Sequence, residues 1–394
     1  MGNLNLFVAA TGMNVGKTSF ILGLIHSLQE KGMKVGYIKP VAQRYVEMDG
    51  KKFSEDALLI KRVFQLPFAA ETLSPCIIEA GFTARYIQGQ LKSFLPKILK
   101  AYKKLKRSSD IVVIEGAGHA GVGAVIDLSN ADVAGLLSAP VLIVAEAGIG
   151  NTIDRVTLNK AFFETKKCRV IGVVVNKVKQ DKYEKVTSLL DKALLNRKIR
   201  MFGSLPYRAT LSSLTLASIK EELGARIIND RGKFDTRIDE NVIATMEPDE
   251  MIDIVSRTNG KVLVITSVDR SDILLACTTL YYGGAKNLAG ILLSGGTIST
   301  PIKEVLRKVE LPVIASDESI YVISSKLHNM GVKISSQDKD KIDMLFKLVP
   351  QHIMVDKLLD SIVSCKIEPQ WIDKISLFFM RLLRNIKAFF LGRW

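Results

Sequence analysis

Residues 11–18 combine small residues, a lysine and a hydroxyl in an order that suits a bound polyphosphate. The stretch reads Thr-Gly-Met-Asn-Val-Gly-Lys-Thr and follows the apolar run of residues 4–9. Small residues let successive backbone N–H groups turn toward an anion, Lys17 adds a positive charge, and the Thr18 hydroxyl is a ligand for Mg²⁺. A helix over residues 18–30 would point the positive end of its dipole at the phosphates. We therefore expect a nucleotide-binding loop here.

This loop departs from the usual G-x-x-x-x-G-K-[ST] pattern at its first position. Thr11 stands where the first glycine is usual, and Gly12 follows it. The alternative is a Gly-Lys-Thr turn that binds nothing, but the apolar strand ahead of the loop favours the phosphate site. The residues expected to contact the nucleotide are Thr11, Gly12, Asn14, Val15, Gly16, Lys17, Thr18 and Ser19.

Further short apolar runs predict the strands that position this loop. They cover residues 35–39, 111–114, 141–145 and 170–175 and alternate with helical patterns at 54–65, 92–105 and 152–164. Such alternation predicts a mostly parallel sheet with helices on both faces, and ligands of these sheets gather where the strands end. The polar residues at or just past those ends are Lys39, Glu115, Glu146 and Asn176.

Two carboxylates are candidate Mg²⁺ ligands beside Thr18. Glu115 ends a strand and leads into a Gly-Ala-Gly loop, and Asp56 opens the helix that follows Lys39. Hard oxygen donors around a phosphate-bound Mg²⁺ are the expected ligand set. Asp56 could instead only complement the helix dipole, as Glu55 also would.

Lys39 and Asn176 are two further candidates for contact with a nucleotide. Pro40 disfavours helical continuation and holds Lys39 at the strand exit, where it could meet a γ-phosphate or an anionic substrate. The amide of Asn176 can donate and accept hydrogen bonds at the edge of a base, although an asparagine after a strand is also a common turn residue.

Composition indicates a globular protein with two domains. The chain has 394 residues, of which 47% are hydrophobic and 24% charged, and this length exceeds what one core usually holds. Its four scattered cysteines form no CxxC pair and indicate a reducing compartment. With no apolar run long enough for a membrane span and no signal-peptide pattern, we expect a cytoplasmic location.

The formal net charge of +15 raises nucleic acid or an anionic membrane as partners. The lysines of residues 97–107, however, share a predicted helix with an apolar stripe, which is typical of a solvated helix face. Nucleic acid therefore stays a minor hypothesis. From Trp371 onward a basic amphipathic helix is predicted, which could lie on an anionic membrane, contact a partner, or dock on the chain itself or a second copy.

Taken together, residues 1–207 resemble the dethiobiotin synthetase-like P-loop proteins, in the version found at the N-terminus of large bacterial phosphate acetyltransferases. The resemblance rests on the loop at 11–18, Lys39-Pro40-Val41, Asp56-Ala57, Glu115-Gly116-Ala117-Gly118, Val174-Val175-Asn176-Lys177 and Leu205-Pro206, in the family's order. It implies that Lys17 and Thr18 bind phosphates and Mg²⁺, Asp56 and Glu115 complete the metal site, Lys39 faces the transferring phosphoryl group, and Asn176 contacts adenine.

Three positions depart from the synthetase pattern. Gly12 replaces an aspartate, Gln43 replaces the serine that follows Lys-Pro, and His119 replaces a glycine after the Glu-Gly-Ala-Gly run. Because the resemblance places a diamino acid substrate on this side of the site, dethiobiotin formation is not expected.

The chain after Tyr207 resembles the small α/β domain named for Asp-Arg and Thr-Gly-Gly signatures (DRTGG). The signatures appear as Asp269-Arg270 and as Ser294-Gly295-Gly296, with strands predicted at 262–266 and 291–293. Together they could form an anion pocket, or only a salt bridge and a tight turn. We expect a P-loop domain at 1–208, a regulatory DRTGG-like domain at 209–325 and a helical extension at 326–394. The remainder after Asp360 is too short for an acetyl-transferring domain, so acetyl transfer is not expected.

Two function classes remain open. In the first, Mg-ATP bound by the P-loop domain alters how the second domain meets a partner or a small anion, with slow ATP hydrolysis. In the second, a ligase-like enzyme activates a carboxylate as an acyl phosphate, with Lys17 and Lys39 as its catalytic residues. We favour the first, because Gln43 and His119 remove the known substrate side of the site. The resemblance also implies a homodimer.

Overall fold

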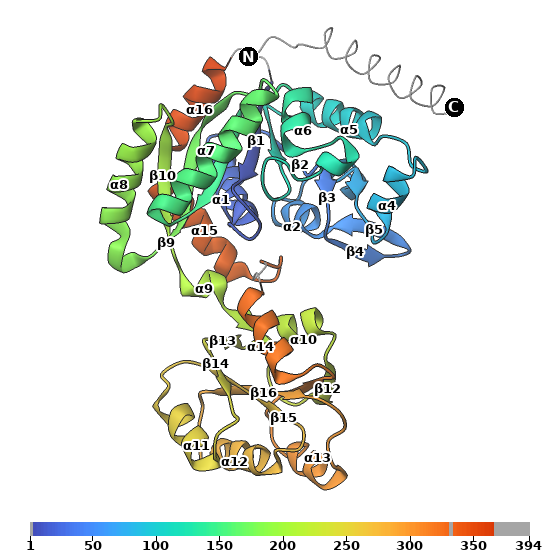
Figure 1. Ribbon diagram of the computed structural model, residues 1–394, viewed down its shortest axis with the longest axis vertical. Coiled ribbons are helices and arrows are strands. Elements are labelled where there is room, and N and C mark those ends of the chain that lie inside the picture. The colour runs from blue at the N-terminus through green and yellow to red at the C-terminus, as the bar shows by residue number, and fades with distance from the viewer. Residues whose placement is uncertain (1–2, 331–333, 366–394) are drawn as a thin grey trace, which may run out of the picture. The chain divides into compact units, whose positions relative to one another are not determined.

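The structure, a computed structural model, describes residues 3–330 and 334–365. These residues form two compact units, one made of residues 3–207 with 334–365 and the other of residues 208–330. The basic helix predicted from Trp371 lies outside the described residues. Each unit is built around its own sheet (Figure 1).

The first unit contains a six-stranded sheet in the order β10-β9-β8-β1-β7-β2, and every pairing in it is parallel. Its strands are almost wholly buried because their sequences are continuous apolar runs, as parallel sheets require. They are β1 (Leu4–Ala10), β2 (Val35–Ile38), β7 (Ile111–Glu115), β8 (Val141–Glu146), β9 (Val170–Val178) and β10 (Met201–Pro206). The predicted parallel sheet is confirmed.

Helices connect these strands and cover both faces of the sheet (Figure 1). Helix α1 follows β1 and buries Phe20 and Leu24, whereas α5 buries Ile98 and Tyr102 and leaves its lysines at the surface. This is the solvated basic face that the sequence predicts. The main helices are α1 (Lys17–Glu30), α2 (Glu55–Val63), α5 (Leu95–Arg107), α6 (Asn130–Leu136), α7 (Ile149–Thr165) and α8 (Tyr183–Leu195).

Two helices from the end of the described chain complete the first unit. Helix α15 (Lys339–His352) runs along α1, where Phe346 stacks on His26 with ring centroids 4.0 Å apart. A Cβ at Gly23 would lie 2.3 Å from Val349, so a glycine is needed for this close approach. Helix α16 (Val355–Ser364) follows. The predicted start of the extension, residue 326, lies inside α14 (Ile320–Asn329). This helix belongs to the second unit, because its apolar face packs in that unit's core.

The second unit has a five-stranded sheet in the order β12-β17-β16-β15-β14, in which only β12 is antiparallel to its neighbour. Helix α10 ends at Gly224, whose φ of 58° is the left-handed conformation of a helix C-terminus. The elements are α9 (Ala209–Ser212), α10 (Leu216–Leu223), β12 (Arg226–Asn229), β14 (Glu240–Ile243), α11 (Pro248–Arg257), β15 (Val262–Ser267), α12 (Ser271–Tyr282), β16 (Leu288–Ser294), α13 (Thr300–Leu306) and β17 (Val313–Ser316).

Several short elements escape the sequence patterns because they are too brief for a periodic signal. The hairpin of β4 and β5 lies between Lys39 and Asp56 in the sequence and accounts for most of the residues that separate them. The short elements are β3 (Val41–Ala42), β4 (Tyr45–Met48), β5 (Lys51–Ser54), α3 (Ala70–Leu73), β6 (Cys76–Ile77), α4 (Phe82–Ile87), β11 (Leu214–Thr215) and β13 (Arg237–Ile238), with 3-10 turns at Ala124–Ile126 and Gln180–Lys182.

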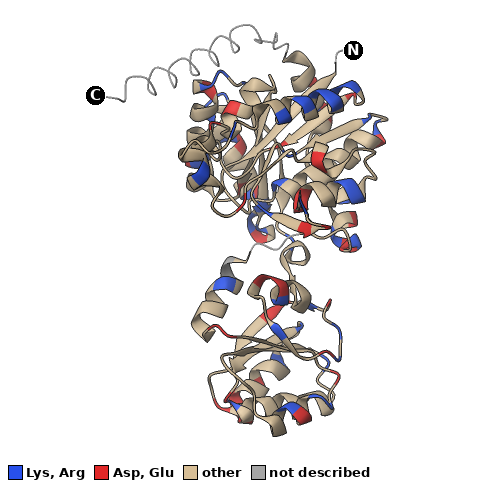
Figure 2. Cartoon of the chain, turned by 90° about the vertical axis from the view of Figure 1, so that its right-hand side faces the viewer, with Lys and Arg blue, Asp and Glu red and all other residues tan. Residues whose placement is uncertain are grey.

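Charged side chains of both signs are interspersed over each unit (Figure 2). All four cysteines are buried thiols, as expected of core residues. Within residues 3–330 and 334–365, no helix has the length and apolarity to cross a membrane.

Candidate functional site

The loop between β1 and α1 has the backbone shape of a phosphate cradle. Asn14 and Gly16 take left-handed conformations, with φ of 55° and 94°, and such a turn directs backbone N–H groups to one side. A Cβ added at Gly16 would lie 2.2 Å from Nδ2 of Asn176. Gly16 is therefore required both by its φ and by the approach of β9, and Lys17 begins the helix directly after it.

Residues at the end of β9 hold this loop in place. Asn176 donates from Nδ2 to the carbonyl oxygen of Val15 at 2.8 Å. Lys177 donates from Nζ to the carbonyl oxygen of Asn14 at 2.7 Å and to Oε1 of Glu146 at 2.9 Å. The structure thus brings Asn176 to the loop and Glu146 to Lys177, which itself bonds to the loop, as the strand-end rule predicts. Contact of Asn176 with adenine stays a prediction.

Next to the loop lies a buried cluster centred on Glu115, which is 1% exposed. Its Oε1 accepts hydrogen bonds from the Thr18 hydroxyl at 2.7 Å and from Nζ of Lys39 at 3.2 Å. Its Oε2 accepts one from the Tyr37 hydroxyl at 2.7 Å. Lys39 also forms an ion pair with Asp56. The structure therefore gathers Thr18, Lys39, Asp56 and Glu115 at one edge of the sheet.

The surroundings shift the pKa values of both lysines, in opposite directions. Burial lowers the pKa of Lys17 to about 8, since the attraction of Glu115 only partly compensates the loss of hydration and nearby Lys39 adds repulsion. Burial acts on Lys39 in the same sense, but Glu115 and Asp56 outweigh it and raise its pKa above the usual value. Lys39 is therefore firmly charged, whereas Lys17 is a buried cation short of a counter-ion.

Tyr37 and Asn130 belong to the site although the sequence patterns give no signal for them. Tyr37 lies inside β2, and burial together with Glu115 raises the pKa of its hydroxyl, so it stays a hydrogen-bond donor. Asn130 donates from Nδ2 to the carbonyl oxygens of Ala117 and His119, both at 2.6 Å, and accepts from the Ala117 amide at 2.9 Å. Its side chain thereby fixes the Gly-Ala-Gly loop that follows Glu115.

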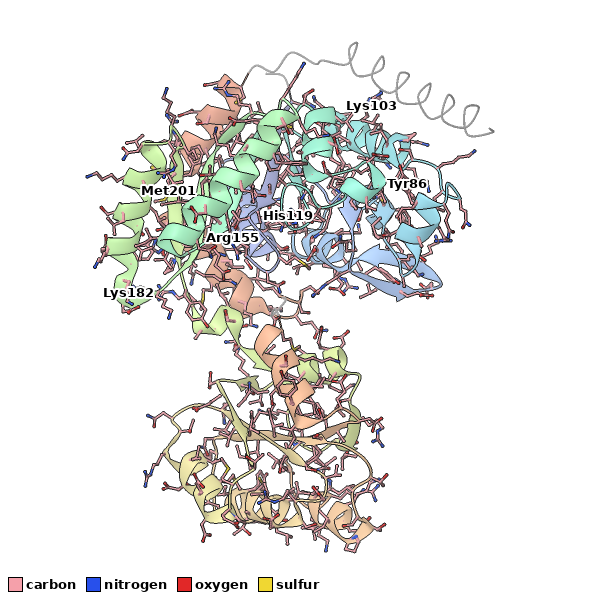
Figure 3. All side chains as sticks on the ribbon, in the orientation of Figure 1. Tyr86, Lys103, His119, Arg155, Lys182 and Met201 are labelled. Carbon is pink, nitrogen blue, oxygen red and sulfur yellow. The ribbon has the colours of Figure 1, made fainter. Side chains whose placement is uncertain are left out.

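Arg155 is a further residue that the sequence reasoning missed. It lies on α7, and its Nη1 is 3.7 Å from where a Cβ of Gly12 would stand (Figure 3). Across residues 3–330 and 334–365, nothing forms a hydrogen bond or ion pair with its guanidinium group. A Cβ at this distance would be in ordinary van der Waals contact with Nη1, so the guanidinium lies directly beside the phosphate loop. The local sequence of Arg155 gives no signal, since only the tertiary structure brings α7 close to the loop.

Two of the three departures from the synthetase pattern are exposed residues, and the third, Gly12, lies in the phosphate loop itself. His119 is exposed, and its ring nitrogen accepts a hydrogen bond from the Gly121 amide at 3.2 Å (Figure 3). Gln43 is exposed just after β3. Neither residue is held in the charged cluster of Glu115.

In the second unit the Asp-Arg signature has a structural role. Arg270 forms a bidentate pair with Asp272, at 2.9 and 2.7 Å, and donates to the carbonyl oxygens of Thr245 and Met246 at 3.1 and 2.8 Å. Ser294 of the other signature donates to the carbonyl oxygen of Glu318 at 2.8 Å. For Arg270 the geometry matches the salt bridge, whereas Gly296 of the second signature lines a cavity.

Comparison with protein families agrees with this architecture. Residues 4–215 match the family described as AAA domain (AAA_26). The chain belongs to the AAA_26 family. Residues 218–330 match the DRTGG domain. An AAA_26 domain followed by a DRTGG domain confirms the predicted resemblance to the N-terminal region of phosphate acetyltransferases, and with it the predicted fold.

Curated relatives of this AAA_26 protein carry the name phosphate acetyltransferase. One from Nitratidesulfovibrio vulgaris is 29% identical in an alignment of 378 positions that covers 92% of this chain and 52% of the relative. One from Nitrosomonas europaea is 27% identical over 90% of this chain and 51% of its own length. The chain spans about half the length of these relatives.

Solved structures similar to this chain include the MinD cell division protein of Aquifex aeolicus, with 14% identity, a TM-score of 0.36 and coverage of 53% of this chain and 84% of MinD. Another contains the CBS and DRTGG domains of the regulatory region of Clostridium perfringens pyrophosphatase, complexed with the activator diadenosine tetraphosphate. It has 20% identity and a TM-score of 0.23, and it covers 30% of this chain and 46% of that one.

Proposed function

We propose that this chain binds Mg-ATP at the loop between β1 and α1 and acts as a nucleotide-responsive regulatory or interaction protein with slow ATPase activity. The single observation that carries the proposal is the meeting of Lys17 and Thr18, at the start of α1, with the carboxylates Asp56 and Glu115. A helix start with a lysine, a hydroxyl and adjacent carboxylates has the donors and charges that a magnesium-bound polyphosphate needs.

Mg²⁺ suits the oxygen donors of this cluster. Thr18, Glu115 and Asp56 would hold it, with Thr18 already hydrogen-bonded to Glu115 at 2.7 Å. Mg²⁺ is typically held by one or two carboxylates together with phosphate oxygens, and when bound it neutralises charge on the phosphates. To release Glu115 and Asp56 for a metal, Lys39 must exchange these partners for phosphate oxygens.

Three cations would surround the phosphates. Lys17 is short of a counter-ion, so a phosphate favours its charged form and should raise its lowered pKa. Lys39 would move from the carboxylates to the terminal phosphate. Arg155, whose guanidinium lies over Gly12, would contact the phosphates from the other side of the loop. Positive groups around a transferring phosphoryl group are the main source of catalysis in such sites.

Regulation would pass through the end of β9. Asn176 and Lys177 both bond to the loop, so a ligand that changes the loop's shape acts directly on that strand end. Mg-ATP would favour one conformation and so change how the second domain meets a partner or small anion. A homodimer across the nucleotide and a cytoplasmic location complete this proposal.

A ligase-like enzyme is the second candidate, and the placement of Lys39 favours it. Lys17 and Lys39 both belong to the cluster of Glu115, where they could stabilise charge during transfer of a phosphoryl group to a carboxylate. The exposed residues His119 and Gln43 would then define a substrate other than a diamino acid.

Calorimetry with ATP and Mg²⁺ on the full chain tests the proposal. We expect saturable binding and a decrease in affinity of roughly a hundredfold or more in Lys17→Ala, because a buried charge on the phosphates is lost. Lys34→Ala is the matched control, since this exposed lysine lies at the opposite end of β2 and should leave binding unchanged.

Equal affinities of wild type and Lys17→Ala, or no binding by the wild type, would overturn the proposal. Incubation with ATP and a mixture of small carboxylic acids then separates the two candidates. Formation of a new product that depends on ATP would establish the ligase, whereas ADP and phosphate without product would support the regulatory ATPase.

A further inference from the structure

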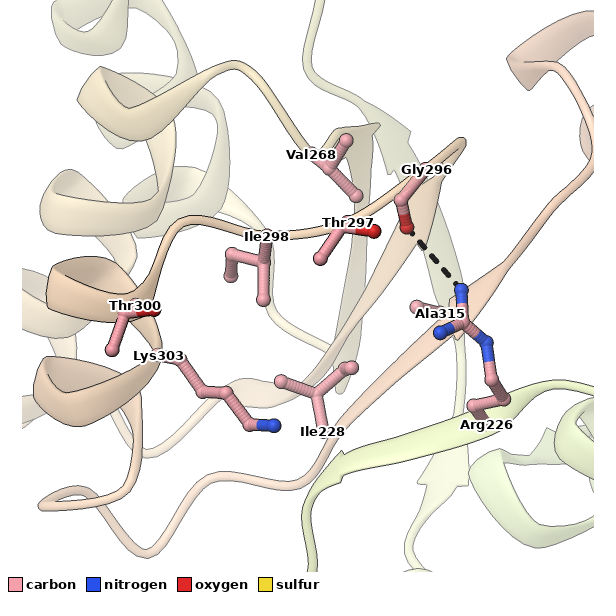
Figure 4. Close-up of a pocket in the computed structure, with 9 residues that line it drawn as sticks. All are labelled: Arg226, Ile228, Val268, Gly296, Thr297, Ile298, Thr300, Lys303 and Ala315. Carbon is pink, nitrogen blue, oxygen red and sulfur yellow. Dashed lines mark hydrogen bonds between the residues drawn. The ribbon is translucent and has the colours of Figure 1, made fainter.

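A cavity of about 170 Å³ opens in the second unit, at the carboxyl ends of its parallel strands (Figure 4). Its wall includes the turn after β16, with Gly296 and Thr297, and Val268 just after β15. Ala315 lies near the end of β17, directly opposite Arg226 of the antiparallel strand β12. Ligands of open α/β sheets bind at this end of the strands.

Two cations reach the cavity from opposite walls. Arg226 donates to the carbonyl oxygen of Gly296 at 3.2 Å and pairs with Asp317 at 2.7 Å, which fixes its guanidinium at the mouth. Lys303 extends from α13 toward Ile228 (Figure 4). Among the residues that the structure describes, none forms a hydrogen bond or ion pair with the ammonium group of Lys303. This half-buried charge therefore has room for an anionic counter-ion.

The remaining wall supplies hydroxyls and an apolar floor. The hydroxyls of Thr297 and Thr300 form no hydrogen bond with any residue in the described parts of the chain. Ile228 and Ile298 contribute apolar surface beside them. The volume lies below the range of about 300 to 1,000 Å³ that is usual for larger ligands. Charge, hydroxyl donors and size together favour a small anion with several oxygens over a whole nucleotide.

We propose that this cavity binds the phosphoryl group of a small phosphate monoester, between Lys303 and Arg226, with its short carbon chain against Ile228. Arginine and lysine both recognise phosphate, arginine by its fork of donors and lysine by its point charge. Thr297 and Thr300 donate to the remaining oxygens. Arg270 of the Asp-Arg signature takes no part, because it does not line the cavity and is bonded to Asp272 and to two carbonyl oxygens. The site is independent of the nucleotide loop of the first unit.

Binding is tested by calorimetry on the full chain that carries Lys17→Ala, so that the nucleotide loop does not contribute. The probes are inorganic phosphate and glycerol 3-phosphate. We expect saturable binding at low millimolar concentration, and Lys303→Met should weaken it about tenfold, the value of one charge-assisted contact. Lys308→Met is the matched control, because this exposed lysine follows α13 and does not line the cavity.

A second variant tests the cavity rather than the charge. Ala315→Leu would fill the floor while keeping both cations, so it should abolish binding of glycerol 3-phosphate, with circular dichroism to establish that the variant folds. Tighter binding of the ester than of inorganic phosphate would identify the organic ligand, and equal binding would identify free phosphate as the ligand of the same phosphoryl site.

Two results would overturn the inference: no binding of either probe, or binding that is equally strong in Lys303→Met. If Ala315→Leu fails to fold, the Lys303→Met result decides alone. Mg-ATP binding by the chain that carries Lys303→Met alone should match wild type, so failure of the cavity and failure of the nucleotide loop are distinguishable.

Discussion

The two units differ in whether the lysines at their candidate sites are paired with carboxylates. In the first, Lys39 and Lys17 are buried beside Asp56 and Glu115, and the cluster contains two cations and two anions. In the second, Lys303 reaches its cavity without a partner among the described residues. Lys39, which is already paired with both carboxylates, has to exchange partners when a ligand arrives, whereas Lys303 would gain a partner directly.

This difference has a physical consequence for response and affinity. In the proposed Mg-ATP complex, Lys39 would leave the carboxylates for phosphate and a cation would replace it there, so phosphate and Mg²⁺ binding would be coupled at the first site. At the cavity no internal contact of Lys303 is lost, and binding there needs no metal. On the two proposals, the first unit would respond cooperatively to phosphate and metal, and the second would bind an anion without a metal.

The largest expected effect is the loss of the buried carboxylate at the first site. Glu115→Gln leaves Lys17 and Lys39 with Asp56 alone, and breaking a buried ion pair in this way lowers the free energy of unfolding by about 3 to 5 kcal/mol. Urea denaturation of the full chain measures it. Glu146→Gln is the control, because Glu146 is 45% exposed in its pair with Lys177 and surface pairs contribute little.

If Glu115→Gln and Glu146→Gln lowered the free energy of unfolding equally, the cluster of Glu115 would not be a buried ion network. The contrast drawn between the two units would then be wrong. The double variant Glu115→Gln with Lys39→Met should regain stability, since it removes the cation that is in excess when Asp56 is the only carboxylate left for two lysines.

The next effect is the contribution of Lys17 to the dependence of stability on pH. Its pKa is about 8 in the folded chain against 10.5 unfolded, so between these values the unfolded chain binds more protons and the free energy of unfolding rises with pH. From pH 8 to 10 the rise amounts to about 2 kcal/mol. Burial raises the pKa of thiols such as Cys76, which lowers the free energy of unfolding as the pH rises. These thiols are present in both wild type and Lys17→Met, so their effect cancels when the two are compared.

Denaturation of wild type and Lys17→Met at several pH values therefore isolates the lysine by difference. The stability that Lys39 gains from its raised pKa is fully present below pH 10.5 and is lost only above it, so it does not interfere in this range. A difference between the two curves that does not change with pH would mean that Lys17 keeps an ordinary pKa.

The smallest effect concerns Arg155, which like Lys303 has no hydrogen-bond or ion-pair partner for its charge among the described residues. Arg155→Ala should weaken Mg-ATP binding about tenfold and leave the unfolding midpoint unchanged, because the guanidinium has no described partner to lose. Added salt should reduce the difference, since Arg155 is exposed. Calorimetry measures both, with Lys160→Ala on the same helix as control. Unchanged affinity in Arg155→Ala would exclude its contact with phosphates.

Much of the first site could be predicted because its residues stand at the ends of periodic elements. Lys17 and Thr18 begin a helix after a buried strand, and Lys39 and Glu115 stand at or beyond strand ends, so one rule about parallel sheets places them together. Tyr37, Asn130 and Arg155 follow no such rule. They enter the site through contacts between elements, and nothing in their local sequence distinguishes them from ordinary core or surface residues.

The sequence by itself determined the parallel sheet, the phosphate loop and the strand-end residues, because hydrophobic periodicity and the glycine, lysine and threonine of the loop act over a few neighbouring residues. Only the tertiary structure decided which partners the charges have. The Glu115 carboxylate accepts hydrogen bonds from Thr18, Tyr37 and Lys39. The cations that line the cavity are Arg226 and Lys303, and Arg270 is not among them. Electrostatic energies depend on distance and burial, and both are set by how separate elements pack.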